Sequence, residues 1–207
     1  MNSQTKVTGV ILAGGLARRM NNQDKGLINY KGHPMVTYAI AALTTVADQS
    51  LINANRNKEQ YEAFGLPVVA DQTGSFDGPL AGVLTAMLYT DSDVLVVIPC
   101  DSPLIKAEHL QKLLLTRADN DADVAVAFDG ERLHPVFLAI KTSLKDRLQD
   151  YLAIGQRQVE HWLKQQKMVK ADFSDEPEIF ININTLTELS ELEAAFYLPL
   201  PPFRKSV

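Results

Sequence analysis

Residues 7–26 read VTGVILAGGLARRMNNQDKG: an apolar run, then a glycine pair, then a group of cations. The apolar run Val7–Leu12 is typical of a buried strand. Gly14 and Gly15 then allow the backbone to approach a ligand closely and to adopt dihedral angles closed to other residues. Because successive N–H groups in such a turn form a concavity for anions, the stretch predicts a strand that ends at a nucleoside triphosphate.

Three cations follow the glycine pair and strengthen this prediction. Arg18 and Arg19 offer planar forks to phosphate, and Lys25 offers a mobile point charge. For each of them, the alternative is an ordinary solvated surface charge. The stretch has neither the Gly-Lys-Ser/Thr end of a Walker loop nor the three glycines of a dinucleotide fingerprint. It therefore indicates a phosphate-binding loop of another kind.

The composition narrows the class of protein. The 207 residues are enough for one domain with a full core. The net charge of -5 argues against a general binder of nucleic acid or membrane surfaces, because no basic stripe is available. The single cysteine, Cys100, excludes an internal disulfide and fits a cytoplasmic protein. No apolar run approaches the roughly 20 residues of a membrane span, and the polar start followed by a short apolar run is unlike a signal peptide.

Short apolar runs alternate with amphipathic runs along the chain, which predicts an α/β fold with a mostly parallel sheet. The predicted strands are Val7–Leu12, 50–54, 67–70, 93–98, Val124–Phe128, 136–140 and 179–183. The predicted helices are 35–46, 58–64, 80–89, 107–116, 144–152, 158–166 and 186–196. We expect a single domain over 1–196, with 93–98 as a central strand buried on both faces, and an irregular tail over 197–207.

Small residues that suit a ligand lie at or just after the ends of four apolar runs. They are the Gly14-Gly15 pair, Asn53, Asp71 and Asp101. Ligands of open parallel sheets lie beyond the carboxyl ends of the strands, so we expect these positions to gather at one edge of the sheet. Turn formation and capping are the alternative roles for Asn and Asp at such places.

Asp101 is a candidate metal ligand. It follows the predicted central strand after Pro99 and Cys100, a short connection that holds its carboxylate close to the expected phosphates. A carboxylate beside a triphosphate makes sense when a hard cation lies between them, and Mg²⁺ is the usual one. The alternative is an N-cap for the next helix, because Asp is a preferred capping residue. Cys100 itself is interpreted as a buried small residue rather than a nucleophile.

Nine short motifs occur in one order along the chain. They are Leu-Ala-Gly-Gly (12–15), Arg-Arg-Met (18–20), Asp-Lys-Gly (24–26), Asn-Ala-Asn-Arg (53–56), Gly-Pro-Leu-Ala-Gly (78–82), Pro-Cys-Asp-x-Pro (99–103), His-Pro (134–135), Gly-x-Arg-x-Val (155–159) and Asn-x-Asn-Thr (182–185). As an ordered set they resemble the motifs of the molybdenum cofactor guanylyltransferases. Asn21 stands where members of that family often have glycine, and Asn tolerates left-handed dihedral angles better than most residues.

The resemblance implies a Rossmann-like three-layer α/β fold, similar to the nucleotide-diphospho-sugar transferases. It assigns the N-terminal half to GTP and the C-terminal half to molybdopterin. The implied GTP-binding residues are Leu12, Ala13, Gly14, Gly15, Lys25, Asn53, Asp71, Gly78, Pro79, Leu80, Gly82 and Asp101. The resemblance also implies that Lys25, Arg19 and Asp101 are catalytic and that Asp101 binds Mg²⁺. For the Gly78 segment, a helix start with proline near the first position is the alternative.

The implied molybdopterin-binding residues lie in the C-terminal half. They are Arg132, His134, Arg157, Asn182 and Asn184. If 179–183 is a strand, the two asparagines present their amides on the same face, because residues two apart in a strand face the same side. An ordinary strand end is the alternative, and Asn184 is also a candidate for one oxygen of the metal shell.

The implied reaction is transfer of GMP from GTP to molybdenum-loaded molybdopterin, with release of pyrophosphate. Besides these two substrates, the expected partners are proteins that deliver or receive the cofactor, with no nucleic acid and no membrane. A cytidylyltransferase acting on the same pterin and a non-catalytic GTP-binding regulator are the alternatives. The cytidine enzymes tend to read Leu-Ala-Ala-Gly, whereas this chain has Gly14 in the deciding position. A silent regulator would not need Asp101.

Overall fold

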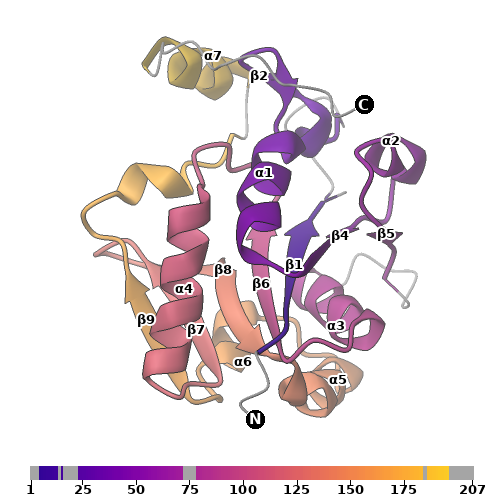
Figure 1. The fold of residues 1–207 in the computed structure, drawn as a ribbon, viewed down its shortest axis with the longest axis vertical. Coiled ribbons are helices and arrows are strands. Elements are labelled where there is room, and N and C mark those ends of the chain that lie inside the picture. The colour runs from indigo at the N-terminus through magenta and orange to yellow at the C-terminus, as the bar shows by residue number, and fades with distance from the viewer. Residues whose placement is uncertain (1–4, 14, 16–22, 72–77, 184–185, 196–207) are drawn as a thin grey trace.

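The computed structural model describes residues 5–13, 15, 23–71, 78–183 and 186–195, and its centre is a seven-stranded sheet (Figure 1). The strands, in their order across the sheet, are β5 (Val68–Val69), β4 (Gln49–Asn53), β1 (Val7–Leu12), β6 (Val94–Pro99), β8 (Leu133–Lys141), β7 (Val124–Phe128) and β9 (Met168–Asp172). Strand β8 runs antiparallel to both of its neighbours, and the remaining pairs are parallel. The predicted mostly parallel sheet is confirmed.

Helices cover both faces of the sheet and give three layers (Figure 1). The helices are α1 (Val36–Val46), α2 (Lys58–Glu62), α3 (Pro79–Tyr89), α4 (Ala107–Asp119), α5 (Lys145–Ala153), α6 (Val159–Leu163) and α7 (Leu186–Ala195). Helices α1 and α4 pack on one face, whereas α3, α5 and α6 pack on the other. Helices α2 and α7 lie at the upper end in Figure 1, beyond the carboxyl ends of the parallel strands. Every predicted helix is confirmed, with shifted ends.

Strand β6 shows how the sequence builds these layers. Val94, Val96 and Ile98 belong to the core cluster under α1 and α4. Leu95 and Val97, which alternate with them, belong to the cluster under α3, α5 and α6. Because successive side chains of a strand point to opposite faces, a continuous apolar run is needed where both faces are covered. The prediction of a central strand buried on both faces is confirmed.

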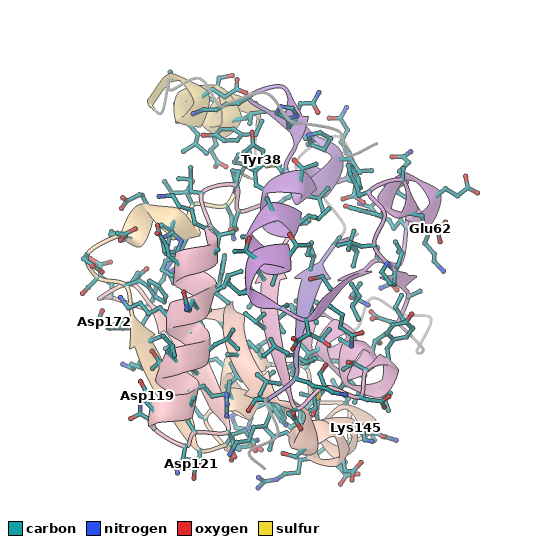
Figure 2. The ribbon with its side chains drawn as sticks, in the orientation of Figure 1. Tyr38, Glu62, Asp119, Asp121, Lys145 and Asp172 are labelled. Atoms are coloured by element: carbon teal, nitrogen blue, oxygen red, sulfur yellow. The ribbon has the colours of Figure 1, made fainter. Side chains whose placement is uncertain are left out.

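Charged side chains occupy the outside of this arrangement. Figure 2 shows Glu62, Asp119 and Asp121 at the surface, and all three are exposed. None of the helices within the described ranges combines the length and the apolar character that a membrane span needs.

The prediction of a strand over 179–183 is wrong. Pro177–Phe180 forms a short 3-10 helix (η3) with proline in its first turn. Proline lacks an N–H and has a fixed φ, which suits the start of a helix and not a paired strand. The last strand of the sheet is β9, which pairs in parallel with β7. Only Ala171 of β9 is buried, so this edge strand carries little of the apolar pattern that predicts a strand.

A small hairpin, not predicted, connects β1 to α1. Its strands are β2 (Asn29–Tyr30) and β3 (His33–Pro34), and Lys31 and Gly32 between them both have positive φ, at 48° and 82°. Two left-handed residues in a two-residue loop match the twist of a hairpin. Tyr30 packs with Leu192 of α7, so the hairpin supports the C-terminal helix.

Candidate functional site

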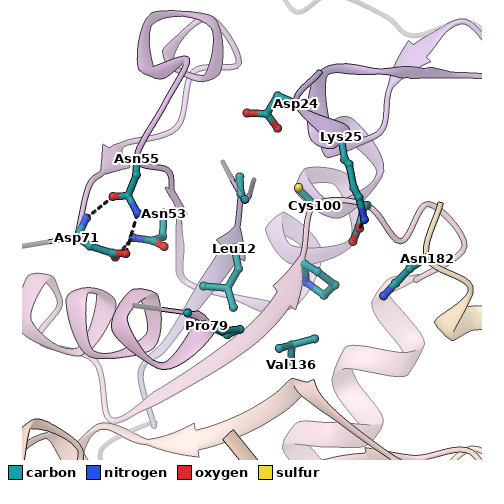
Figure 3. A pocket seen from close by; sticks show the side chains of 15 residues that line it. Leu12, Asp24, Lys25, Asn53, Asn55, Asp71, Pro79, Cys100, Val136 and Asn182 are labelled. Atoms are coloured by element: carbon teal, nitrogen blue, oxygen red, sulfur yellow. Dashed lines mark hydrogen bonds and ion pairs between the residues drawn. The ribbon is translucent and has the colours of Figure 1, made fainter. Parts of the chain in front are cut away.

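A cavity of about 460 Å³ opens at the carboxyl ends of β1, β4 and β6 (Figure 3). Its lining residues are Leu12, Ala13, Gly15, Asp24, Lys25, Asn53, Asn55, Asp71, Gly78, Pro79, Pro99, Cys100, Asp101, Val136 and Asn182. The predicted gathering of Gly15, Asn53, Asp71 and Asp101 at one edge of the sheet is confirmed. The topology brings them together because parallel strands deliver their carboxyl ends to the same edge.

The floor of the cavity continues β1. Ala13 N donates to the carbonyl oxygen of Asn53 at 2.8 Å, which carries the strand pairing one residue past Leu12. Within the described residues, a Cβ added at Gly15 would meet no atom within 4 Å. Gly15 therefore borders open space next to the cavity. Gly14 lies outside the described residues.

Two asparagines and an aspartate form a polar group at one end of the cavity. Asn53 Nδ2 donates to Asp71 Oδ1 and Asn55 Nδ2 donates to Asp71 Oδ2, each at 2.8 Å. Asn55 Oδ1 in turn accepts from Asp71 N at 2.8 Å, and Thr85 Oγ1 donates to Asp71 Oδ1 at 3.2 Å. Figure 3 shows this polar group on the left, across Leu12 and Pro79 from the opposite wall. Its carboxylate is held in one orientation.

Helix α3 borders the same end of the cavity, and the helix-start interpretation of its motif is confirmed. Gly78 caps the helix with φ 80° and ψ -176°, a conformation that is essentially restricted to glycine, and Pro79 follows at the first position. Gly82 leaves room for the side chains of Asn53 and Leu12, which a Cβ there would overlap. Leu80 is 1% exposed in the core and does not line the cavity.

A lysine and an aspartate face each other at the opposite end. Lys25 Nζ lies 2.9 Å from Asp101 Oδ2, and their side chains are 24% and 11% exposed. Lys25 begins the 3-10 helix η1 (Lys25–Leu27), and Asp101 follows the last residue of β6 after Cys100. The alternative role of Asp101 as a helix cap is wrong, because the N-cap of α4 is Lys106, in a capping box with His109.

Two further polar lining residues were not among the predicted site residues. Asp24 is 6% exposed and lies beside Lys25 in the Asp-Lys-Gly motif. Asn55 comes two residues after Asn53, a spacing that can bring two side chains to the same side of an extended segment. Both residues belong to the sequence motifs, but Asp and Asn at such positions also occur in ordinary turns.

Cys100 lies against the lysine and aspartate pair as a buried thiol. Burial raises the pKa of Cys100, and the neighbouring carboxylates of Asp101 and Asp24 raise it further. The interpretation of Cys100 as a buried residue is confirmed. A thiol with a raised pKa does not supply the thiolate that nucleophilic chemistry needs.

A second cavity of about 400 Å³ adjoins the first. It is lined by Asp129, Arg132, His134, Pro177, Phe180, Ile181 and Asn182, and Asn182 lines both cavities. His134 Nε2 lies 2.6 Å from Asp129 Oδ2, and its ring stacks on Phe180 with centroids 4.0 Å apart. Arg132 is exposed and lies 3.6 Å from the same carboxylate. The structure therefore brings together three of the residues predicted to bind molybdopterin: Arg132, His134 and Asn182.

The segment that carries Asn182 is fixed beside Asp101. Asn182 Oδ1 accepts from Ser102 Oγ at 2.6 Å, and Ile183 N donates to the carbonyl oxygen of Asp101 at 3.4 Å. The predicted strand geometry for Asn182 and Asn184 does not occur, because this segment follows η3, and Asn184 lies outside the described residues.

Two other predicted residues do not join the cavities. Arg157 lines neither cavity, and its Nη1 donates to the carbonyl oxygens of Leu152 and Gln156, both at 2.7 Å. That contact ties the end of α5 to the start of α6. Arg19, like Arg18, lies outside the described residues.

The residues of the first cavity fit a Mg²⁺ ion that arrives with a triphosphate. Asp101 offers a carboxylate whose ion pair with Lys25 uses Oδ2, and the carboxylate of Asp24 lines the same cavity. Within the described ranges, no three or more His, Cys, Asp or Glu side chains are grouped to hold a metal. The two carboxylates of Asp101 and Asp24 suit Mg²⁺, because this ion commonly takes one or two carboxylates and completes its shell with phosphate oxygens and water.

The chain matches the family model of the MobA-like NTP transferase domain over residues 9–170. Among curated relatives, the molybdenum cofactor guanylyltransferase of Shewanella loihica is 42% identical over 190 residues, which cover 92% of this chain and 97% of that protein. The enzyme of the same name from Shewanella frigidimarina is 43% identical over 187 residues, 90% of this chain and 95% of that protein.

Solved structures show the same fold. The molybdopterin-guanine dinucleotide biosynthesis protein A of Archaeoglobus fulgidus superposes with a TM-score of 0.76 at 21% identity, over 91% of this chain and 97% of that one. The 4-diphosphocytidyl-2C-methyl-D-erythritol synthase of Anaerococcus prevotii superposes with a TM-score of 0.68 at 12% identity, over 92% of this chain and 96% of that one. From its fold and its sequence, the chain belongs to the family of MobA-like NTP transferases.

Proposed function

We propose that this protein transfers GMP from GTP to molybdopterin that carries molybdenum. The observation that carries the proposal is the cavity itself, which has a carboxylate–amide group at one end and the Lys25–Asp101 pair at the other. A nucleotide needs such a division, with hydrogen-bonding groups for its base and charges for its phosphates. The relatives are named as guanylyltransferases of the molybdenum cofactor, which supports molybdopterin as the group that accepts GMP.

The base belongs at the polar end of the cavity. Guanine presents adjacent N–H donors at its ring and exocyclic nitrogens, and a carboxylate is an acceptor that suits them. Asp71 is held for this role by Asn53 and Asn55, and Leu12 and Pro79 provide apolar surface beside it. Adenine and cytosine present a different order of donors and acceptors to the same groups. The arrangement therefore favours guanine.

The triphosphate belongs between Gly15 and the Lys25–Asp101 pair. An acceptor phosphate oxygen attacks the α-phosphorus, the bond from that phosphorus to the bridging oxygen breaks, and pyrophosphate leaves. Lys25 stabilises the negative charge that develops on the phosphoryl oxygens, and Arg19 is assigned the same task. Mg²⁺, held by Asp101 and the phosphates, supplies further positive charge when bound. No protein base is required, because the attacking phosphate is already ionised near neutral pH.

The acceptor belongs in the second cavity, beyond Asn182. Arg132 provides an exposed cation for its phosphate, and the cavity lined by His134 and Phe180 provides the space for its pterin ring. Asn182 lines both cavities, so an acceptor there lies next to the triphosphate. We place the reaction in the cytoplasm, where proteins that deliver and receive the cofactor are the expected partners.

The test is incubation of the protein with molybdenum-loaded molybdopterin, MgCl₂ and each of the four nucleoside triphosphates, followed by product analysis. We expect the guanine dinucleotide and pyrophosphate from GTP, and little product from CTP, ATP or UTP. A preference for CTP would make the protein a cytidylyltransferase. Tight GTP binding without release of pyrophosphate would make it a GTP-binding regulator.

A further inference from the structure

A buried tyrosine outside both cavities contacts the motif that carries Lys25. Tyr61 belongs to α2 and is 0% exposed, and it does not line the cavity. Its hydroxyl lies 2.6 Å from Asp24 Oδ1, and Asn57 Nδ2 lies 3.1 Å from Asp24 Oδ2. A distance of 2.6 Å is typical of a charge-assisted bond from a hydroxyl to a carboxylate. Asp24 is therefore held from behind the cavity by α2.

Asp24 determines the shape of the turn that begins at Lys25. It is the N-cap of η1, and its Oδ1 accepts from Gly26 N at 3.3 Å. The N–H groups at the start of a helical turn have no partner within the turn, so a capping side chain fixes where the turn begins. Rotation of the Asp24 carboxylate would release this turn, and the backbone of Lys25 would move with it.

The same tyrosine reaches the segment that carries Asp101. A Cβ added at Gly26 would lie 2.6 Å from the Tyr61 hydroxyl oxygen and 3.1 Å from both Cβ and Sγ of Cys100. Gly26 is thus packed between the Tyr61 hydroxyl and Cys100, and Asp101 is the next residue along the chain. The hydroxyl lies where the turn with Lys25 meets the segment with Asp101.

The chemistry of the hydroxyl suits a permanent donor. The Tyr61 hydroxyl is fully buried, and a phenol carries its proton at neutral pH and can donate it. A buried carboxylate that loses a donor is costly, because its lone pairs then lack the hydrogen bonds that water would supply. Asp24 consequently depends on Tyr61 to stay in its buried position.

We propose that Tyr61 is a positioning residue that holds Lys25 against Asp101, acting through the carboxylate of Asp24 and the packing of Gly26 on Cys100. The consequence for transfer rests on the proposed function, in which Lys25 contacts the triphosphate. The placement of Lys25 beside Asp101 does not depend on the proposed function, and crystal structures test it without any assay of transfer.

The structural test compares crystal structures of the wild-type protein and Tyr61→Phe. Phenylalanine keeps the ring and removes only the hydroxyl. We expect the Asp24 carboxylate to leave its present position and the 2.9 Å ion pair between Lys25 and Asp101 to open. An unchanged ion pair and an unchanged turn in Tyr61→Phe would overturn the proposal, whatever reaction the protein catalyses.

The kinetic test uses Tyr61→Phe, Lys25→Ala and the double variant. Misplacement of a charge by about 1 Å can cost about 10²-fold in rate, so we expect kcat of Tyr61→Phe to fall at least tenfold. In the Lys25→Ala background the same substitution should change kcat less than twofold, because residues that act through one group are not additive. An equal loss in both backgrounds would show a merely structural role and would overturn the proposal.

Tyr151→Phe is the matched control. Its hydroxyl is part-buried and donates to the carbonyl oxygen of Gln158 at 3.0 Å, away from both cavities. The Tyr151→Phe variant therefore loses one hydrogen-bonded hydroxyl that has no link to Lys25. Its kcat should match that of the wild-type protein. If the wild-type protein makes no guanine dinucleotide, the proposed function fails, and the crystal structures still decide the role of Tyr61.

Discussion

Lys25 and Asp101 form an ion pair across 76 positions of sequence, with Nζ 2.9 Å from Oδ2. One partner begins a 3-10 turn after β1, and the other follows β6, the strand that pairs with β1. The pair therefore depends on the parallel contact of these two strands, which brings both segments to one edge of the sheet. It places opposite charges at the end of the cavity where phosphates and their cation are proposed to bind.

Removal of the Asp101 charge should abolish transfer while GTP still binds in part. Asp101→Asn keeps the shape and one oxygen, and Asp101→Ala removes both. We expect kcat to fall by about 10²-fold or more in both variants, since preorganised charges at a phosphoryl group commonly contribute that much. The Lys25 side chain is partly exposed and can be hydrated when its partner is lost, so both variants should remain folded.

The measurement for Asp101 is Mg²⁺-dependent turnover together with the melting temperature. Glu160→Gln is a suitable control, because it removes a carboxylate from an exposed ion pair with Lys164 at 2.6 Å. The control should keep full activity. An Asp101→Asn protein with wild-type turnover would exclude Asp101 as the metal ligand.

Replacement of Lys25 by alanine should slow transfer far more than it weakens the fold. The side chain is partly exposed and contacts the cavity, so its loss leaves the core intact. We expect kcat to fall by about 10²–10³-fold, measured as release of pyrophosphate at saturating GTP. Lys164→Ala removes an exposed lysine that caps the end of α6, and it should leave turnover unchanged. Unchanged turnover in Lys25→Ala would remove this residue from the mechanism.

Gly15 of the cavity and Gly26 of η1 should respond differently to alanine. At Gly26 a Cβ would overlap the Tyr61 hydroxyl and press on Cys100, so Gly26→Ala should lose about 1–3 kcal/mol of unfolding free energy. At Gly15 a Cβ meets no atom within 4 Å among the described residues, so Gly15→Ala should keep its stability. The methyl group of the new alanine takes space where we propose that the phosphates of GTP bind, so GTP affinity should fall.

Urea unfolding and GTP titration of both alanine variants separate these effects. Stability loss is expected for Gly26→Ala, and affinity loss without stability loss is expected for Gly15→Ala. Wild-type GTP affinity in a well-folded Gly15→Ala protein would mean that the triphosphate does not approach this turn.

Asp129 should make the stability of the protein depend on pH in the acid range. Its Oδ1 accepts from the backbone N–H groups of Arg132 at 2.8 Å and Glu131 at 2.9 Å, and Oδ2 lies 2.6 Å from His134 Nε2. The Arg132 hydrogen bond, followed by the His134 contact, lowers the pKa of Asp129. A depressed folded-state pKa stabilises the fold above the unfolded value near about 4, and this contribution is lost as the pH falls.

The check is the unfolding free energy of wild type and Asp129→Asn at pH 7 and pH 3. At pH 7 the variant should be less stable, and the difference should shrink at pH 3, because the Asp129 carboxylate of the unfolded chain is largely protonated there. Glu62→Gln, which changes an exposed charge on α2, should show a small difference at both values. A difference for Asp129→Asn that stays constant between the two pH values would contradict this account.

The features that depend on local pattern follow from the amino-acid sequence alone. The continuous apolar run of β6 requires cover on both faces, and Gly78-Pro79 favours the start of a helix. The ends of successive parallel strands also had to meet at one edge, which is why Asn53, Asp71 and Asp101 were found together. The first two conclusions follow from residues that are neighbours in the chain, and the third follows from the order of the strands along it.

The features that depend on contact between distant segments arise from the packing of the folded chain. Strand β9 has one buried residue, Ala171, and exists because β7 offers it a free edge. Asp24 and Tyr61 are 37 positions apart, and no spacing rule links a carboxylate in a turn to a tyrosine on a helix. The sequence sets which groups can bond, but the packing of α2 against the turn after β1 selects which of them do.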